Sequence, residues 1–587
     1  MIQLTINKKK IDAEPGMTIL EAAKRNGINI PTLCYMKGVH NHKIGACRIC
    51  SVEVEGARNL QAACITEIKD GMVINTHSKK VLKARKVLYE LMLSDHSKNC
   101  LSCDRNQLCE LQQLGEVLGI TENRFITGSV REQVDISPAI TRDLSKCILC
   151  HRCVTVCKEI QEIGILDVQN RGFDTVIAHA MGTSINNSKC VFCGQCVVVC
   201  PVGALKETSH ITKVWNAIHN PDVRVVMQAA PAVRVGLGEM FGYPVGTPVT
   251  GMMAAAMRYL GVDDVFDTNW AADLTIMEEG TEFLHRAVDT LTGKKAMLPM
   301  ITSCSPGWVK YLEGYYPQLI PHLSTCKSPH MMLGALAKTY YAEKIKDTRE
   351  ICTVSVMPCT AKKFEITRKE TDINGIPNVD AVITTRELGR MIEQAGIDFR
   401  HLGEENFDAP MGQSTGAAEI FGVTGGVMEA AIRTVYPIIT GKDLPFEEFH
   451  IPSIIGLDKV KEASIKFENV LDEYKMFEGF ELKIAVTSGL SGAKILMEQI
   501  VAGNSPYHFI EVMGCPGGCI CGGGQPRSND PDVRTQRLKG IYDIDEGKVI
   551  RQSHLNPSIK TVYDEYLGEP GSELAHKLLH THYTDRS

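Results

Sequence analysis

The sequence lacks several features that would place it in a common class of protein. It has no apolar run of about 18 residues, the length that a membrane-spanning helix requires. Met1–Lys10 alternates polar and apolar residues instead of forming the apolar stretch of a secretory signal. It has no block of Lys and Arg, and its net charge is only −6. We therefore expect a cytoplasmic protein with no membrane span and no nucleic-acid partner.

Loops that bind nucleotides are also absent from the sequence. No Gly-x-Gly-x-x-Gly segment follows a predicted strand, and there is no Walker-type loop. The segment Gly236–Gly242 is rich in glycine, but its spacing fits neither motif. The chain therefore shows no flavin or nicotinamide site of its own.

Cysteine, by contrast, is abundant, with 22 cysteines among 587 residues. A chain of this length has room for about four domains and needs no disulfides to supplement a small core. Most of the cysteines stand two or three residues apart, as metal ligands do. This pattern excludes a secreted disulfide scaffold and predicts metal centres in a reducing compartment.

Cysteine spacing and periodicity predict a multidomain α+β and α/β protein. The predicted domains are 1–78, 79–125, 141–210 and 211–587. Residues 1–78 combine strand-like alternation with one helical stretch, as in a small α+β domain. The helical period of the second domain puts four apolar residues on one face: Val81, Val87, Leu88 and Leu91. In the last domain, apolar strands alternate with helices, which indicates an α/β fold with a largely parallel sheet.

The first cysteine group fits a [2Fe–2S] centre. Its members are Cys34, Cys47, Cys50 and Cys64. Four thiolates with one tight pair in a small β-rich unit are typical of plant-type ferredoxins, although the spacing differs somewhat. A structural zinc on four thiolates is the alternative. The surrounding α+β pattern favours the iron–sulfur cluster.

The second group combines one histidine with three cysteines. Its members are His96, Cys100, Cys103 and Cys109. Such a set can hold a structural zinc or a [4Fe–4S] cluster. Its place between two electron-carrying modules favours the cluster, because zinc cannot change oxidation state.

The strongest signal is a cysteine run that occurs twice, as in bacterial two-cluster ferredoxins. In that run the fourth cysteine of each copy ligates the other cluster. One predicted [4Fe–4S] cluster is therefore held by Cys147, Cys150, Cys153 and Cys200. The other is held by Cys190, Cys193, Cys196 and Cys157. Together with the first two groups, this predicts one [2Fe–2S] and three [4Fe–4S] clusters that carry electrons in series.

Three segments of the last domain contain most of the remaining cysteines: Thr302–Trp308, Met357–Lys363 and Glu511–Gly524. Together they closely resemble the three signature segments of the iron-only (FeFe) hydrogenases. The N-terminal modules also match the large clostridial-type members in order and nearly in spacing, so the resemblance covers essentially the whole chain. Several relatives of this layout are catalytic subunits of NAD(P)-linked hydrogenase complexes.

The resemblance implies reversible conversion of H₂ into protons and electrons at an H-cluster. This cofactor joins a [4Fe–4S] cubane to a two-iron unit that carries CO, cyanide and a bridging dithiolate amine. The implied residues are Cys359, Cys515 and Cys519 as cubane ligands (Cys519 also bridging to the two-iron unit), Pro231, Met357 and Met513 as pocket lining, and Lys362 as a hydrogen-bond donor to a cyanide. Soft thiolates suit iron, and methionine gives a polarizable apolar lining.

The first segment departs from the family at one position. Members usually carry two adjacent cysteines, the first relaying protons and the second ligating the cubane, whereas this chain has Cys304 and Ser305. Either Cys304 ligates the cubane and Ser305 relays protons, or Cys304 stays the relay and the cubane has an unusual ligand. Because a cubane needs a fourth thiolate, we expect Cys304 to be the ligand.

The resemblance also implies a proton path through Glu279, Glu282 and Ser324. The two glutamates stand three positions apart and share a face if this stretch is helical. On the residues alone, a solvated helix face would be the commoner interpretation. His330 stands where the family often has a polar amide. The cysteines left over, which we expect to be core thiols, are Cys326, Cys352 and Cys521.

Other functions differ from this one in features that the sequence can show. A non-catalytic iron–sulfur electron-transfer subunit would lack the three C-terminal segments. A hydrogenase-like iron–sulfur assembly protein would normally lack the [2Fe–2S] module. A hydrogen sensor is harder to separate, but no signalling domain is visible. We expect electrons to pass to ferredoxin, or to flavin- or NAD(P)-binding subunits of a hetero-oligomer, through residues 1–125.

Overall fold

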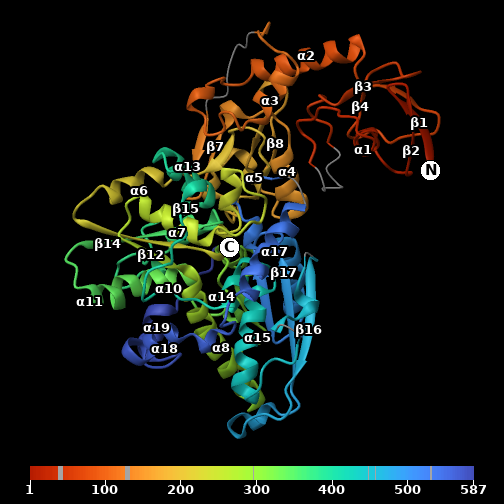
Figure 1. The fold of residues 1–587 in the computed structure, drawn as a ribbon. Coiled ribbons are helices and arrows are strands. Elements are labelled where there is room, and N and C mark those ends of the chain that lie inside the picture. Colours follow the sequence, from red (N-terminus) through yellow and green to blue (C-terminus); the bar gives the residue numbers. More distant parts are fainter. Residues whose placement is uncertain (37–43, 126–132, 295, 447–448, 457, 529–531) are drawn as a thin grey trace. The chain divides into compact units, whose positions relative to one another are not determined.

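The computed structural model describes residues 1–36, 44–125, 133–294, 296–446, 449–456, 458–528 and 532–587. The chain divides into two compact units. The N-terminal unit comprises Met1–Ser188 and Val199–Lys206, and the C-terminal unit comprises Lys189–Val198 and Glu207–Ser587. Their elements are labelled in Figure 1. The four domain boundaries expected from the sequence stay predictions.

The N-terminal unit begins with a five-stranded sheet of order β2-β1-β5-β3-β4. Its strands are β1 (Ile2–Ile6), β2 (Lys9–Ala13), β3 (Ser51–Val54), β4 (Gln61–Ala62) and β5 (Val73–Asn75). Helix α1 (Ile19–Arg25) starts at a capping box, in which Thr18 and Glu21 each accept the other's backbone N–H. Apolar side chains of the sheet and of α1 share one core. The α+β fold expected here is confirmed.

Two helices follow, α2 (Lys79–Ser94) and α3 (Glu110–Val117). The helical period is confirmed, but the apolar face expected from the sequence is only partly buried. Val81 is buried, whereas Leu91 is 47% exposed. The buried face instead includes Arg85, whose guanidinium donates to two backbone carbonyl oxygens. These hydrogen bonds let a charged side chain take a position that periodicity reserves for apolar residues.

Short elements surround the ferredoxin-like cysteine runs. They are β6 (Val134–Ile136), β7 (Ile140–Asp143), β8 (Asp167–Gln169), β9 (Val176–Ala178), β10 (Leu205–Glu207), α4 (Arg152–Thr155) and α5 (Gln195–Val199). Strands β10, β7 and β6 form one small sheet, and β8 pairs with β9. Helix α4 continues into a π-helical turn that contains Cys157.

The C-terminal unit is built on two four-stranded sheets, where the sequence suggested one largely parallel sheet. The first has the order β12-β11-β14-β15, with all neighbours parallel. The second has the order β13-β18-β17-β16, in which β16 pairs antiparallel with β17 and the other neighbours are parallel. The strands are β11 (Val223–Ala229), β12 (Asp264–Asp267), β13 (Met300–Ile301), β14 (Glu350–Met357), β15 (Ala381–Thr384), β16 (Val460–Lys466), β17 (Glu481–Ser488) and β18 (Phe509–Met513).

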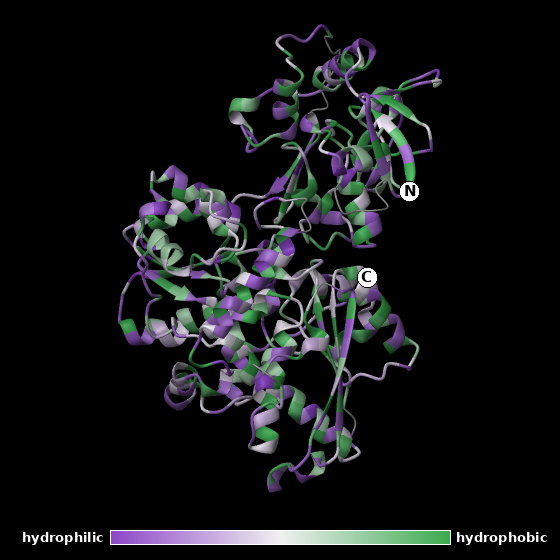
Figure 2. Cartoon of the chain, turned by 45° about the vertical axis from the view of Figure 1, so that its right-hand side comes forward, coloured by the Kyte–Doolittle hydropathy of each residue, from purple (hydrophilic) through white to green (hydrophobic). Residues whose placement is uncertain are grey.

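Helices pack on both sheets. They are α6 (Ile211–Ile218), α7 (Thr250–Tyr259), α8 (Thr268–Leu291), α9 (Pro306–Tyr315), α10 (Pro329–Leu336), α11 (Ala342–Ile345), α12 (Ala361–Glu365), α13 (Thr385–Gln394), α14 (Gly416–Glu419), α15 (Gly426–Thr440), α16 (Leu490–Val501), α17 (Asp532–Glu546), α18 (Pro557–Val562) and α19 (Glu573–Leu579). Helix α8 is buried over most of its length and lies beside α15 (Figure 1). Many helices alternate hydrophobic and hydrophilic residues, as expected of helices with one buried face (Figure 2).

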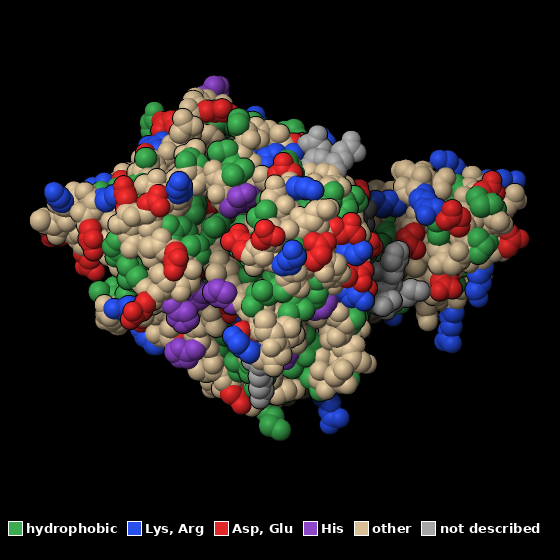
Figure 3. Space-filling view, turned by 90° about the horizontal axis from the view of Figure 1, so that it is seen from below, with side chains coloured by type: hydrophobic (Ala, Val, Ile, Leu, Met, Phe, Trp, Pro, Cys, Tyr) green, Lys and Arg blue, Asp and Glu red, His purple; other side chains and the backbone are tan. Residues whose placement is uncertain are grey.

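Within the described residues, no helix has both the length and the apolar character that a membrane crossing needs. The face in Figure 3 carries acidic and basic side chains interspersed with hydrophobic patches. This mixture agrees with the small net charge of −6.

Candidate active site and metal centres

Both sheets of the C-terminal unit end at one cavity. Strand β14 ends at Met357, two residues before Cys359, and β18 ends at Met513, two residues before Cys515. The segments that follow β11 and β13 line the same cavity. Active sites of α/β sheets lie at the carboxyl ends of strands. Here the ends of two sheets supply a single site.

The cavity collects all the residues that the resemblance assigns to the cofactor. Those that line it are Pro231, Cys304, Met357, Cys359, Lys362, Met513, Cys515 and Cys519. A Cβ on Gly522 would lie 2.1 Å from the carbonyl oxygen of Pro358, so only glycine lets these two segments approach so closely.

Three thiols of this cavity form a set of soft donors. Burial raises the pKa of Cys359, Cys515 and Cys519, and the charge of Cys359 raises the last two further. The pKa of Cys519 reaches about 12. Without a cation these groups stay protonated thiols, whereas iron would bind them as thiolates. Convergent sulfur donors beside methionine side chains fit an iron–sulfur cubane.

Lys362 is held at the cavity by a buried network. Its ammonium donates to the carbonyl oxygen of Cys304 at 3.1 Å and pairs with Glu365 at 2.8 Å. His330 Nε2 lies 2.8 Å from the same carboxylate oxygen. Burial disfavours ionisation of Glu365, but the charge of Lys362 outweighs it and lowers the pKa of that carboxyl. Burial lowers the pKa of His330 to about 4, so the ring is neutral.

Cys304 and Ser305 have different neighbours. The pKa of Cys304 is raised by burial first and then by the charge of Glu279, which places the thiol within reach of that carboxyl's field. The Ser305 hydroxyl accepts the backbone N–H of Gly514 at 3.1 Å, and Gly514 directly precedes Cys515. The charge of Cys519, an expected cubane ligand, also raises the pKa of Cys304, so Cys304 is close to both the glutamate and the expected cubane ligands, whereas Ser305 contacts the backbone before Cys515.

Glu279 and Glu282 lie on helix α8, which confirms the helix expected there. Ser324 acts on both, because its hydroxyl donates to Glu282 at 3.0 Å and its influence lowers the pKa of Glu279. Burial nevertheless raises the pKa of Glu279 to about 8. Its Oε2 is buried, with no hydrogen-bond partner among the described residues. A carboxyl with this pKa can both accept and release a proton near neutral pH.

In the N-terminal unit, the four cysteines of the first group lie close together. Cys50 Sγ is 3.3 Å from Cys64 Sγ. Hydrogen bonds with Cys34 raise the pKa of both Cys47 and Cys64. Residues 37–43, between the first two cysteines, lie outside the described residues. The four buried thiols fit a four-thiolate centre.

The second group lines one cavity, formed in part by His96, Cys100, Cys103 and Cys109. His96 Nδ1 accepts the Lys98 N–H at 3.2 Å, while its buried Nε2 has no hydrogen-bond partner among the described residues. Burial lowers the pKa of His96, which keeps the ring neutral. His96 Nε2 shares this cavity with three thiols and has no hydrogen-bond partner among the described residues, so it is suited to bind a metal ion.

The repeated run is partly assembled within one unit. A third cavity is lined by one expected set, Cys147, Cys150, Cys153 and Cys200. This set includes the fourth cysteine of the other run, as the ferredoxin pattern requires. In the remaining set, Cys157 belongs to the N-terminal unit and its three partners to the C-terminal unit. That ligand set stays a prediction.

Sequence reasoning missed two charged residues of the site. Arg286 pairs with Glu282 at 2.6 Å, and Glu365 holds Lys362. Both stand one helical turn from their partners, at i, i+4 and i, i+3. That spacing is a signal that could have identified them.

Models of known protein families match most of the chain. The matches are "Iron only hydrogenase large subunit, C-terminal domain" over 223–523, "Iron hydrogenase small subunit" over 531–586, "2Fe-2S iron-sulfur cluster binding domain" over 1–79, "NADH-ubiquinone oxidoreductase-G iron-sulfur binding region" over 85–124, and "NADH-quinone oxidoreductase subunit 3, ferredoxin-like domain" over 137–206. The first of these covers half of the chain.

Individual relatives agree with the family models. The chain is 50% identical to the NADP-reducing hydrogenase subunit HndD of Solidesulfovibrio fructosivorans, over 100% of this chain and 99% of the relative. It is 40% identical to iron hydrogenase 1 of Clostridium pasteurianum, over 99% of this chain and 100% of the relative. The solved structure of a variant of the [FeFe]-hydrogenase HydA1 from Chlamydomonas reinhardtii matches 64% of this chain and 99% of that chain, with a TM-score of 0.58 and 41% identity. The chain therefore belongs to the iron-only hydrogenase family, as an oxidoreductase acting on H₂ with an iron–sulfur electron relay.

Proposed function

We propose that the strand-end cavity binds the H-cluster through Cys359, Cys515 and Cys519, and that this site interconverts H₂ with protons and electrons. The observation that carries the proposal is the convergence of these three thiols, from two distant segments, on one cavity. When bound, the cofactor supplies the iron chemistry that activates H₂. The protein itself supplies the thiolate ligands, an apolar lining that excludes water, the ammonium group of Lys362 and a path for protons.

The lining excludes water from the cofactor. Pro231, Met357 and Met513 present apolar surface to the cavity. Lys362 is the polar exception, and its contacts with Glu365 and the Cys304 carbonyl hold its ammonium in place. A cation fixed in this way can donate to an anionic cyanide without reorganising.

We assign protons to a path that runs from Glu282 through Ser324 and Glu279 to Cys304. Three observations support it: the 3.0 Å hydrogen bond between Ser324 and Glu282, the influence of Ser324 on the pKa of Glu279, and the influence of Glu279 on the pKa of Cys304. This assignment adopts the alternative in which Cys304 is the relay. Ser305, whose hydroxyl accepts the N–H of Gly514, would then be the fourth ligand of the cubane, with oxygen in place of sulfur.

The N-terminal unit and the repeated cysteine run are proposed to hold one [2Fe–2S] and three [4Fe–4S] clusters. The grouping of three ligand sets within the N-terminal unit supports three of these clusters. Clusters in series carry electrons between the catalytic cavity and an external partner. Zinc at the His96 site would leave this chain of carriers one member short.

We propose that the partner is a complex subunit that handles NADP(H). The relative HndD is named as a subunit of an NADP-reducing hydrogenase, and no nucleotide-binding loop is visible in this sequence. Ferredoxin is the other partner expected from the sequence. The expected cytoplasmic location stays a prediction.

The test is H₂ uptake by anaerobically purified, cofactor-matured protein, assayed with an artificial dye, ferredoxin, NAD⁺ and NADP⁺ in separate reactions. The chain alone is expected to reduce the dye, and to reduce NADP⁺ only after its partner subunits are added. Reduction of NADP⁺ by the chain alone would contradict the proposed division of labour.

A further inference from the structure

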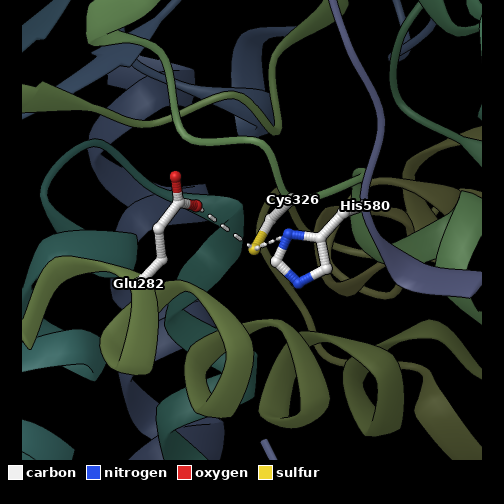
Figure 4. A group of neighbouring side chains, drawn as sticks. All are labelled: Glu282, Cys326 and His580. Carbon is white, nitrogen blue, oxygen red and sulfur yellow. Dashed lines mark hydrogen bonds between the residues drawn. The ribbon is translucent and has the colours of Figure 1, made fainter. Parts of the chain in front are cut away.

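A cluster of metal-ligating side chains lies outside the residues used so far. Glu282, Cys326 and His580 each offer a ligand atom, and these atoms all lie within 4.8 Å of one another. Figure 4 shows the Cys326 sulfur between the Glu282 carboxylate and the His580 ring. Cys326 and His580 are 254 residues apart in the sequence, but an antiparallel β-bridge pairs them. The backbone therefore fixes the sulfur next to the ring.

The imidazole of His580 is oriented as a metal ligand would be. Its Nε2 lies 3.1 Å from an oxygen of the buried Glu278 carboxylate, which can only accept a hydrogen bond when ionised. The proton is thereby assigned to Nε2, and Nδ1 keeps its lone pair. Nδ1 accepts the Thr325 hydroxyl at 2.7 Å and lies 4.0 Å from Cys326 Sγ. A carboxylate that holds the far nitrogen of a histidine is the usual support of zinc-binding histidines.

The distances within the cluster come close to those of a tetrahedral zinc site. Cys326 Sγ lies 3.9 Å from Glu282 Oε2 and 4.0 Å from His580 Nδ1. Zinc bonds of about 2.3 Å to sulfur and about 2.0 Å to nitrogen or oxygen place tetrahedral ligand atoms about 3.5 Å apart. The two sulfur distances would shorten by about half an ångström, and the distance between Glu282 and His580, which is within 4.8 Å, would shorten to about 3.3 Å. One sulfur, one nitrogen and one oxygen ligand suit Zn²⁺ and disfavour Ca²⁺ and Mg²⁺, which prefer oxygen.

The charges around the cluster balance a divalent cation. Glu278 and Glu282 are carboxylates, Cys326 would bind as a thiolate, and Arg286 pairs with the other oxygen of Glu282. These groups carry a net charge of two negative units when the thiol is ionised. Burial and the charges of the neighbouring glutamates raise the pKa of Cys326, so zinc would displace a thiol proton to solvent. The Glu282 side chain is 14% exposed, which leaves ions a way in.

We propose that Glu282, Cys326 and His580 form a Zn²⁺ site, with solvent as the fourth ligand. Two segments contribute to it, since Glu282 and Cys326 lie in the region matched by the large-subunit family model and His580 in the region matched by the small-subunit model. Zinc on Glu282 Oε2 would take the oxygen that accepts the Ser324 hydroxyl. Bound zinc would thus interrupt the proton path, a consequence that rests on the proposed function.

Zinc binding is tested on the holoprotein with all clusters loaded, after removal of loose metal with a chelator. Wild-type protein, Cys326→Ala and His580→Gln are equilibrated with Zn²⁺, and bound zinc is counted by elemental analysis. Cys352→Ala is the matched control, because it removes a thiol of the same unit that lies outside the cluster. Zinc-edge X-ray absorption of the wild type reports whether sulfur is among the ligands. The inhibition of H₂ uptake by Zn²⁺ is measured on the same samples.

The expected result is one more bound zinc in the wild type and in Cys352→Ala than in the other two variants, with one sulfur ligand near 2.3 Å. Zinc should also slow H₂ uptake by the wild type at least tenfold more than uptake by Cys326→Ala. Equal zinc contents in all four proteins, or a wild-type spectrum without sulfur, would overturn the site. Zinc bound as expected without inhibition would keep the site and overturn the role of Glu282 in the proton path.

Discussion

The two units hold their cysteines in different ways. In the N-terminal unit, each of three ligand sets includes a short loop in which neighbouring ligands are separated by two to five residues. In the C-terminal unit, the ligands stand at the ends of strands that belong to two sheets. A loop site needs only local geometry, whereas a strand-end site depends on the packing of the whole unit.

This difference matches the work of the two regions. An electron carrier needs a cluster and little else, so a compact loop suffices. A catalytic site also needs a fixed cation, an apolar lining and a proton path, and we propose that Lys362, Met357 and the α8 glutamates supply them. Substitutions in the C-terminal unit should therefore impair H₂ chemistry, and substitutions in the N-terminal unit should impair electron transfer.

Cys519→Ala should reduce dye-linked H₂ uptake by more than a thousandfold. The substitution removes a thiolate that the cofactor requires, and no neighbouring oxygen ligand replaces it. The N-terminal clusters should keep their EPR signals, because their ligands stand elsewhere. Cys521→Ala, two positions away, serves as the control and should stay within threefold of the wild type. More than a tenth of wild-type activity in Cys519→Ala would contradict the assignment.

Glu279→Gln should lower H₂ uptake by about a hundredfold, since positioned proton donors and acceptors contribute about that much. An amide keeps the shape of the carboxyl but cannot pass on a proton. The infrared bands of the cofactor should be unchanged, which separates proton transfer from cofactor loading. Asp289→Asn removes another carboxylate from α8 at an exposed position and should have no effect. Similar losses in both variants would point to damage to the helix instead.

Cys103→Ala tests the other region. It should reduce NADP⁺ reduction by the assembled complex at least tenfold, because one electron carrier is lost, while dye-linked H₂ uptake stays above half. Ser102→Ala alters the neighbouring exposed residue and should change neither rate. An equal loss in both assays of Cys103→Ala would show that the N-terminal unit is needed for catalysis itself.

Ser305→Cys addresses the position at which the chain departs from its family. If Ser305 stands at a cubane corner, a thiol there should shift the EPR spectrum of the cubane, with activity within about threefold of the wild type, because Cys304 and the proton path are untouched. Ser305→Ala should shift the spectrum differently. Spectra identical to the wild type in both variants would make Cys304 the ligand after all.

The smallest expected effect is on stability. The pKa of Glu279 in the folded protein, about 8, lies above the ordinary value of 4.5, so the folded state binds more protons between these pH values. Stability contributed by this protonated group is therefore lost as pH rises through that window. As pH rises from 5 to 8.5, the thermal midpoint of the wild type should fall by a few degrees relative to that of Glu279→Gln, which has no carboxyl to ionise. A constant difference across this range would show that the carboxyl is ionised throughout.

Sequence patterns identified much of this architecture because iron–sulfur ligands follow local spacing rules. The strands before Cys359 and Cys515 were also visible, since apolar runs of that length are typical of buried strands. The division into two sheets was not, because an apolar run does not specify its neighbour. The buried face of α2 was missed because Arg85 is satisfied by backbone oxygens.

The cluster of Glu282, Cys326 and His580 shows the limit of such reasoning most clearly. No spacing rule connects residues that are 254 positions apart, and only the β-bridge brings them together. The roles of Cys304 and Ser305 stay a proposal, because the Cys304 thiol is influenced by both Glu279 and Cys519.

The most direct test of the central claim is the infrared spectrum of anaerobically matured protein, recorded for the wild type and for Cys519→Ala. The claim is that the cavity at the strand ends holds the H-cluster. It predicts stretching bands of CO and cyanide in the wild type and their loss in the variant. Bands of equal intensity in both proteins, or an active wild type without such bands, would contradict it.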